Sequence, residues 1–184
     1  CGASIDFVDI DPLTRNIDID ALEIKLQVAA TQNCLPKVLI VVHFSGLSCD
    51  MLAIQKLTQI HSIVLIEDAA HALGGSYQES KVGSCAYSDM AVLSFHPVKS
   101  ITSAEGGAVL TNQSGFHEKL KLFAKHGITK DPLQYQGESH GPWYYQQLEL
   151  GYNYRLSDLH AALGLSQLKK LDRFIQNRSN LAQI

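Results

Sequence analysis

Residues 38–68 read VLIVVHFSGLSCDMLAIQKLTQIHSIVLIED, and the fold class follows from this stretch. It opens with an uninterrupted aliphatic run from Val38 to Val42, which is typical of a strand covered on both faces in a parallel sheet. Apolar residues then recur at helical spacing from Met51 to Leu57, and Ile63 to Ile66 forms a second aliphatic run. Strand, helix and parallel strand make a βαβ unit. The sequence therefore predicts an α/β protein with a central, mostly parallel sheet sandwiched by helices.

The flanking residues continue this alternation of strands and helices. On the N-terminal side we expect a strand from Ser4 to Asp9, then a helix that Asp20 begins, with Glu23 completing its capping box, and that ends before Pro36. On the C-terminal side we expect strands at 91–95 and 107–110, a helix through 116–123 capped by Gly127, a loop over 128–151, and one long helix or a kinked pair over 156–175.

Composition excludes several classes of protein. The 184 residues are 46% hydrophobic and 18% charged, with a formal net charge of -3, so the chain should fold and should not bind nucleic acid. No apolar run approaches the roughly 20 residues that span a bilayer, and we expect a cytoplasmic protein without a membrane partner. The four cysteines form no CxxC pair and are expected to be free thiols. The histidines form no metal-binding motif. The sequence also lacks the GxSxG motif that would predict a hydrolase.

The two ends of the sequence indicate a fragment. The chain opens with Cys1 rather than Met, and it stops at Ile184 inside a predicted helix without a Gly or Pro stop signal. We therefore expect a piece of a larger domain.

The buried strand at 63–66 runs out into Glu67 and Asp68, which places Asp68 at the carboxyl end where open α/β sheets bind ligands. There a carboxylate could accept a hydrogen bond from a protonated ring nitrogen, and His71, three residues later, could share the same pocket. The alternative is an ordinary helix cap or turn acid.

Lys99 also follows a predicted strand, in the segment Ser94 to Lys99. A partly desolvated lysine in an electropositive pocket can serve as a nucleophile, whereas most lysines are simply exposed. The glycine pairs at 74–75 and 106–107 suit either a tight turn or a close approach to a ligand, and a simple hairpin would also explain the second pair.

Four motifs occur in order along the chain: DAAHALGG at 68–75, SFHPVK at 94–99, EGG at 105–107 and GYNYR at 151–155. Together they resemble the DegT/DnrJ/EryC1/StrS family of sugar aminotransferases, over nearly the whole chain. The resemblance implies a fold type I enzyme that uses pyridoxal 5'-phosphate (PLP). Residues 1–184 would then be part of the PLP-binding large domain, with an N-terminal segment and a C-terminal small domain missing.

The resemblance also implies roles for five residues. Lys99 would carry the cofactor covalently and shuttle the proton during transamination, and Asp68 would pair with the ring nitrogen. His71 would contact the phenolic oxygen, and Ser94 would bind the phosphate. Asn153 would reach the phosphate of the neighbouring subunit's cofactor, so the active site would be shared across a homodimer.

Within the family, residues 1–11, 94–112 and 151–173 are most similar to the aminotransferases of pseudaminic acid biosynthesis. This similarity implies a UDP-linked 4-keto-6-deoxy sugar as acceptor and glutamate as amino donor. Two alternatives stay open: a non-catalytic PLP-binding or oligomerisation domain, and a PLP-dependent sugar dehydratase. Family members that act as dehydratases carry His at the lysine position, so Lys99 favours transamination.

Overall fold

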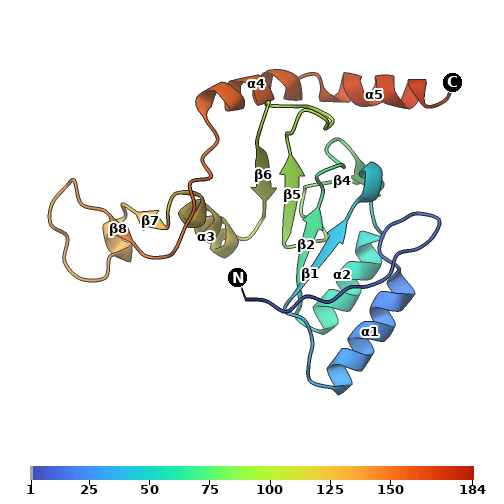
Figure 1. Ribbon diagram of the computed structural model, residues 1–184, viewed down its shortest axis with the longest axis horizontal. Helices are drawn as coiled ribbons and strands as arrows, with labels where there is room; N and C mark the ends of the chain where they lie inside the picture. Colours follow the sequence, from blue (N-terminus) through green and yellow to red (C-terminus); the bar gives the residue numbers. More distant parts are fainter. Residues whose placement is uncertain (1) are drawn as a thin grey trace.

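The computed structural model describes residues 2–184 and is built on a four-stranded sheet (Figure 1). The strands are β1 (Val38–Val42), β2 (Val64–Asp68), β5 (Met90–Ser94) and β6 (Gly107–Leu110), in the order β1-β2-β5-β6. The first three are parallel, and β6 runs antiparallel to β5. The predicted α/β class with a mostly parallel sheet is confirmed, and the βαβ unit forms where the sequence placed it.

Two helices cover one face of β1 and β2: α1 (Ile19–Thr31) and α2 (Met51–Ile60). The core between helices and sheet contains Leu22, Val41 and Leu65. Other members of this core are Leu26, Cys49, Met51, Ile54 and Ile63. Burial of these side chains is the main force that holds the helices on the sheet.

The start of α1 corrects one expectation. Asp18, not Asp20, is the N-cap residue, because its side chain accepts a hydrogen bond from the Ala21 N–H at 2.9 Å. Asp20 lies in the first turn of the helix, where a carboxylate still interacts favourably with the helix dipole. The helix ends at Thr31, before Pro36, as predicted.

The other face of β1 is uncovered within residues 2–184. Val38, Ile40 and Val42 are 45%, 60% and 45% exposed, whereas Val41 is buried. The expectation that this strand is covered on both faces is therefore not met in this chain. An unbroken aliphatic run indicates that both faces of a strand are apolar, but it does not identify the segments that cover the two faces.

The predicted strand from Ser4 to Asp9 is wrong. These residues lie outside any strand, and only Ile10 forms an isolated bridge, with Ile17. The segment is attached instead by Lys25, whose Nζ lies 2.7 Å from the Asp6 carboxylate. Strand propensity without a neighbouring strand to pair with does not produce a strand.

The rest of the chain adds short elements and three helices. Residues 156–175, predicted as one helix or a kinked pair, form α4 (Asp158–Leu168) and α5 (Leu171–Leu181). The helix predicted through 116–123 ends at Ala124 with Lys125 as its C-cap residue, and His126, with a φ of 61°, is the first left-handed residue after it. The expected cap, Gly127, lies one residue further on, where its φ is 68° and its N–H donates to Leu122 O. The remaining elements are η1 (Phe44–Gly46), β3 (Ser76–Tyr77), β4 (Ser80–Lys81), α3 (Ser114–Ala124), β7 (Ile128–Thr129), η2 (Pro132–Gln134) and β8 (Gln146–Gln147).

Helices α4 and α5 run across the edge of the sheet at which β5 ends (Figure 1). Arg178 of α5 donates to Ser100 O at 3.1 Å, in the loop after β5. At Gly74, after β2, a Cβ would lie 3.0 Å from the Ile175 side chain. The loops that follow β2 and β5 therefore lie between the sheet edge and these two helices.

Candidate active site

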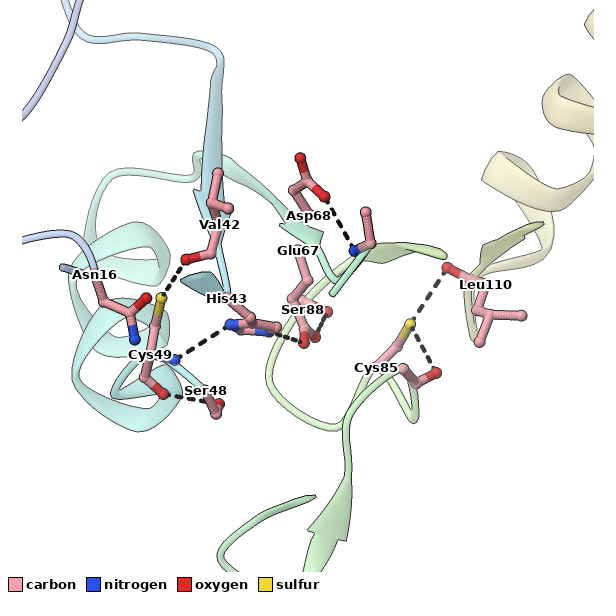
Figure 2. A network of polar contacts seen from close by, with 12 residues as sticks. Asn16, Val42, His43, Ser48, Cys49, Glu67, Asp68, Cys85, Ser88 and Leu110 are labelled. Atoms are coloured by element: carbon pink, nitrogen blue, oxygen red, sulfur yellow. Dashed lines mark hydrogen bonds and ion pairs between the residues drawn. The ribbon is translucent and has the colours of Figure 1, made fainter. Parts of the chain in front are cut away.

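Asp68 is the last residue of β2, at the carboxyl end of the parallel strands. Side chains alternate along a strand, so Glu67 points into the face covered by α1 and α2 while Asp68 points to the opposite face (Figure 2). The Ala70 N–H donates to Asp68 Oδ1 at 3.1 Å. One oxygen of Asp68, Oδ1, therefore stabilises the turn after β2. The other oxygen, Oδ2, receives no hydrogen bond from residues 2–184.

Ser94 is the last residue of β5, the strand next to β2. Asp68 pairs with Val92, so Ser94 lies two residues further along β5 and on the same face of the sheet as Asp68. Its Oγ accepts a hydrogen bond from the His96 N–H at 3.4 Å. The structure therefore brings a carboxylate and a hydroxyl to one edge and one face of the sheet.

Lys99 lies in the loop between β5 and β6, half-buried. The loop is closed at its base, because the Phe95 N–H donates to Gly106 O at 2.9 Å and the Ser103 N–H donates to Phe95 O at 3.0 Å. Lys99 lines a cavity of about 320 Å³ between this loop and α5, together with Phe174. Lys99 is therefore more buried than an ordinary surface lysine. The closed loop holds the residue beyond the end of β5.

The glycine pair at 106–107 has a structural cause. Gly106 has a φ of 140°, a conformation that other residues rarely adopt. A Cβ on Gly107 would lie 2.7 Å from Leu93 O on the paired strand. The pair therefore closes the loop that carries Lys99, as the hairpin interpretation predicts.

His71 and Asn153 are both exposed, and within residues 2–184 neither forms a hydrogen bond with Asp68 or Ser94. His71 is exposed in the turn that follows β2. Asn153 lies in the exposed segment between β8 and α4, where its backbone bridges Lys125 at the end of α3. The Arg155 Nε donates to Asn153 Oδ1 at 2.9 Å, which leaves the Asn153 amide nitrogen free to donate.

A buried polar network that was not predicted from the sequence lies directly beneath Asp68. His43 Nε2 lies 2.8 Å from Glu67 Oε2, and Ser88 Oγ donates to Glu67 Oε1 (Figure 2). His43 and Glu67 are 0% and 5% exposed. A sequence signal was available, because His43 directly follows the aliphatic run of β1 just as Asp68 follows that of β2.

The described thiols are free, as expected: Cys34 is exposed, and Cys49 and Cys85 are buried. Burial raises the pKa of the Cys49 thiol to about 11 and also raises the pKa of Cys85. Cys1 lies outside the described residues. Within residues 2–184 no group of three or more His, Cys, Asp or Glu could hold a metal ion, and no helix is long and apolar enough to span a membrane.

Comparison with known proteins decides the family. The model of the DegT/DnrJ/EryC1/StrS aminotransferase family matches residues 1–184. The chain belongs to this family. The UDP-4-amino-4,6-dideoxy-N-acetyl-beta-L-altrosamine transaminase of Campylobacter jejuni is 44% identical over 180 residues, which are 98% of this chain and 44% of that protein. The chain thus spans less than half the length of this relative.

Solved structures of family members match the fold. Helicobacter pylori PseC, an aminotransferase involved in the biosynthesis of pseudoaminic acid, matches with a TM-score of 0.85 and 37% identity over 99% of this chain and 44% of that one. The PLP form of the putative sugar aminotransferase Spr1654 from Streptococcus pneumoniae matches with a TM-score of 0.79 and 26% identity, over 99% and 47% of the two chains. The family predicted from four motifs, and the similarity to pseudaminic acid aminotransferases within it, are confirmed.

Proposed function

We propose that the full-length protein containing this chain is a PLP-dependent aminotransferase that transfers the amino group of glutamate to a UDP-linked 4-keto-6-deoxy sugar, in pseudaminic acid or related surface-glycan biosynthesis. The single observation that carries the proposal is the edge of the sheet where Asp68 and Ser94 end adjacent parallel strands and Lys99 follows in the next loop. The identity to the Campylobacter transaminase supports the sugar class. Residues 1–184 are proposed to be part of the PLP-binding large domain.

The residues at this edge fit the cofactor chemically. The Asp68 carboxylate has one oxygen held by the Ala70 N–H, so the second oxygen can accept a hydrogen bond from a ring N–H. The Ser94 hydroxyl can donate to a phosphate oxygen, and the half-buried Lys99 provides an amine. His71 is the proposed contact of the phenolic oxygen.

When bound, PLP supplies an electron sink for the electrons left behind as a proton leaves the amino-donor carbon. In this proposal the Lys99 amine would take up that proton, hold it in the site and pass it on. Asp68 would hold the positive charge of a protonated ring nitrogen, while Ser94 would hold the phosphate end. Asn153 is proposed to complete the site of a partner subunit, so the active enzyme is a homodimer. The cytoplasmic location stays a prediction from the sequence.

The test is to assay the full-length protein against a panel of UDP- and dTDP-linked 4-keto sugars with glutamate, following the amino sugar by mass spectrometry. We expect a product from a UDP-linked 4-keto-6-deoxy sugar and none from the Lys99→Ala variant. PLP binding without any amino-sugar product would favour a non-catalytic domain, and loss of a sugar hydroxyl without amination would favour a dehydratase. Either result contradicts the proposal.

A further inference from the structure

The feature that the proposed mechanism leaves unused is the buried pair of His43 and Glu67, at the ends of β1 and β2 (Figure 2). Both side chains lie on the covered face of the sheet, opposite Asp68. All of their hydrogen-bonding groups that are buried have partners, and the ring nitrogen to carboxylate distance is 2.8 Å. A buried carboxylate is costly unless it is paired in this way.

The hydrogen bonds define the protonation of the pair. His43 Nδ1 accepts the Cys49 N–H at 3.2 Å, so Nδ1 carries a lone pair and the ring proton is on Nε2. Nε2 therefore donates to Glu67, and Ser88 donates to the other carboxylate oxygen. The network is a neutral imidazole and a hydroxyl donating to one carboxylate. All buried side-chain nitrogen and oxygen atoms of the network have partners, and a fully satisfied buried network is rigid.

This network is connected to Asp68 through the backbone. The His43 N–H donates to the carbonyl oxygen of Asp68 at 3.1 Å, and Glu67 is the preceding residue of the same strand. On the other side, the Ala69 N–H donates to Val92 O at 2.9 Å. Asp68 is the point at which both connections meet, so the orientation of its peptide depends on where the His43 ring and the Glu67 side chain are held.

Stability alone does not account for such a pair. Replacing buried ionic or polar pairs by apolar side chains is often neutral or stabilising, so a paired carboxylate in a core is a poor stabilising device. Catalytic groups, by contrast, must be held within a fraction of an ångström. The pair is therefore better explained by the geometry that it imposes on its neighbour than by the energy that it contributes.

We propose that His43 and Glu67 are positioning residues that hold the Asp68 carboxylate against the ring nitrogen of the cofactor. The proposal rests on the proposed function. His43 and Glu67, on the covered face of the sheet, would thus affect the chemistry on the opposite face through the end of β2, where Asp68 lies. Neither side chain touches the cofactor.

The experiment uses the full-length holoenzyme with PLP labelled with ¹⁵N in the ring. The ¹⁵N chemical shift distinguishes a protonated ring nitrogen from a neutral one. Glu67→Gln should move the signal toward the neutral form and lower kcat about 10- to 100-fold with little change in KM for the sugar. The Asp68→Asn variant, which lacks the charge partner itself, should show the largest change in the ¹⁵N chemical shift. If Glu67 acts through Asp68, the double variant should be no worse than Asp68→Asn alone.

The matched control is Thr58→Val, which removes a buried hydroxyl from α2 in the same core, where Thr58 is 2% exposed and donates to Gln55 O. It should lower the melting temperature without moving the ¹⁵N signal or kcat. A Glu67→Gln enzyme that behaves like this control overturns the proposal, and so do losses that add in the double variant.

A second variant covers failure of Glu67→Gln to fold. Ser88→Ala removes one hydrogen bond to the Glu67 carboxylate and keeps the pair. A smaller ¹⁵N shift in the same direction is expected, and an unchanged signal overturns the proposal. A wild-type protein that binds no PLP contradicts the proposed function itself, which is a distinct result.

Discussion

In the proposed mechanism Asp68 combines two roles, because a carboxylate has two oxygens. Oδ1 accepts the Ala70 N–H and forms the turn after β2, while Oδ2 is left for a ligand. The turn-acid interpretation and the functional interpretation of this residue are therefore compatible. The turn orients the carboxylate, and this orientation leaves Oδ2 available to accept a hydrogen bond from a ligand.

Asp68→Asn separates the two roles. The Asn side-chain oxygen can still accept the Ala70 N–H, so the melting temperature of the full-length protein should stay close to that of the wild type. The amide is uncharged and cannot hold a protonated ring nitrogen, so kcat should fall by about 10³-fold or more, as when other charge partners at active sites are removed. Steady-state kinetics and calorimetry measure the two quantities. Near-wild-type activity would contradict the role of Asp68.

The described thiols should differ in reactivity with a maleimide at pH 8. Raising the pKa of Cys49 from 9.0 to about 11 lowers its thiolate fraction about 100-fold, and the side chain is also buried. Cys34 is exposed and should react first. Peptide mapping after timed labelling measures the order, with labelling in denaturant as the control. Rapid modification of Cys49 in the native protein would contradict its placement in the core.

The β5–β6 connection shows how an element places Lys99, the proposed catalytic side chain. Residues 95–106 form a loop closed by backbone bonds at its base, and the antiparallel pairing of Ser94 with Gly107 continues the closure into the sheet. Because the chain returns immediately along β5, Lys99 stays beside the strand end that it follows. The glycine pair is what permits this close return.

Gly107→Ala should therefore destabilise the full-length protein, because its Cβ would lie 2.7 Å from Leu93 O. We expect the free energy of unfolding to fall by about 1–3 kcal/mol, as for other forced contacts in a packed interior. Gly115→Ala is the matched control, since a Cβ there meets nothing within 4 Å and Gly115 is helical. That change should stabilise by about 0.4–1 kcal/mol. Equal effects of the two substitutions in urea titrations would contradict the packing described for Gly107.

Elements with a strong local signal were predictable from the sequence. The aliphatic runs of β1 and β2 and the helical spacing between them define a βαβ unit without any tertiary information. The segment at 4–9 was predicted as a strand but has no partner strand within residues 2–184, and pairing is a tertiary property that a local pattern does not contain. The position of the α1 cap was wrong by two residues because Asp18 and Asp20 are both good caps, and only the backbone conformation at Asp18 decides between them.

The candidate site was predictable to a similar extent. Polar residues after buried strands identified Asp68 and the Ser94–Lys99 segment, because parallel strands end at a common edge. The same rule applied to β1 would have identified His43. The pairing of His43 with Glu67 was not predictable, because it depends on the register of β1 against β2.

At the scale of the whole molecule, no hydrogen bond within residues 2–184 joins the segment around Asn153 to Asp68. Its backbone is fixed to the end of α3, where the Tyr152 N–H donates to Phe123 O at 2.7 Å and the Tyr154 N–H donates to Ala124 O at 3.0 Å. Asn153 is exposed, and its amide is oriented by Arg155. This arrangement is consistent with the proposal that Asn153 serves the active site of a partner subunit.

Mixing two inactive variants tests the shared site. In a heterodimer of Lys99→Ala and Asn153→Ala subunits, one site receives both defects and the other receives none. Random exchange of subunits in a twofold dimer should then restore about a quarter of wild-type activity. The assay is amino-sugar formation after the two full-length variants are unfolded and refolded together, with each variant refolded alone as the control. No recovery in the mixture would contradict a shared site.

Lys99 is proposed to carry the cofactor, and borohydride reduction of the full-length protein with PLP can show whether it does. Reduction makes the bond between the cofactor and its lysine permanent, so peptide mass spectrometry can locate it. We expect a pyridoxyl group on the peptide that contains Lys99, and none in the Lys99→Ala variant. A pyridoxyl group on another lysine, or no adduct at all, would rule out this role for Lys99.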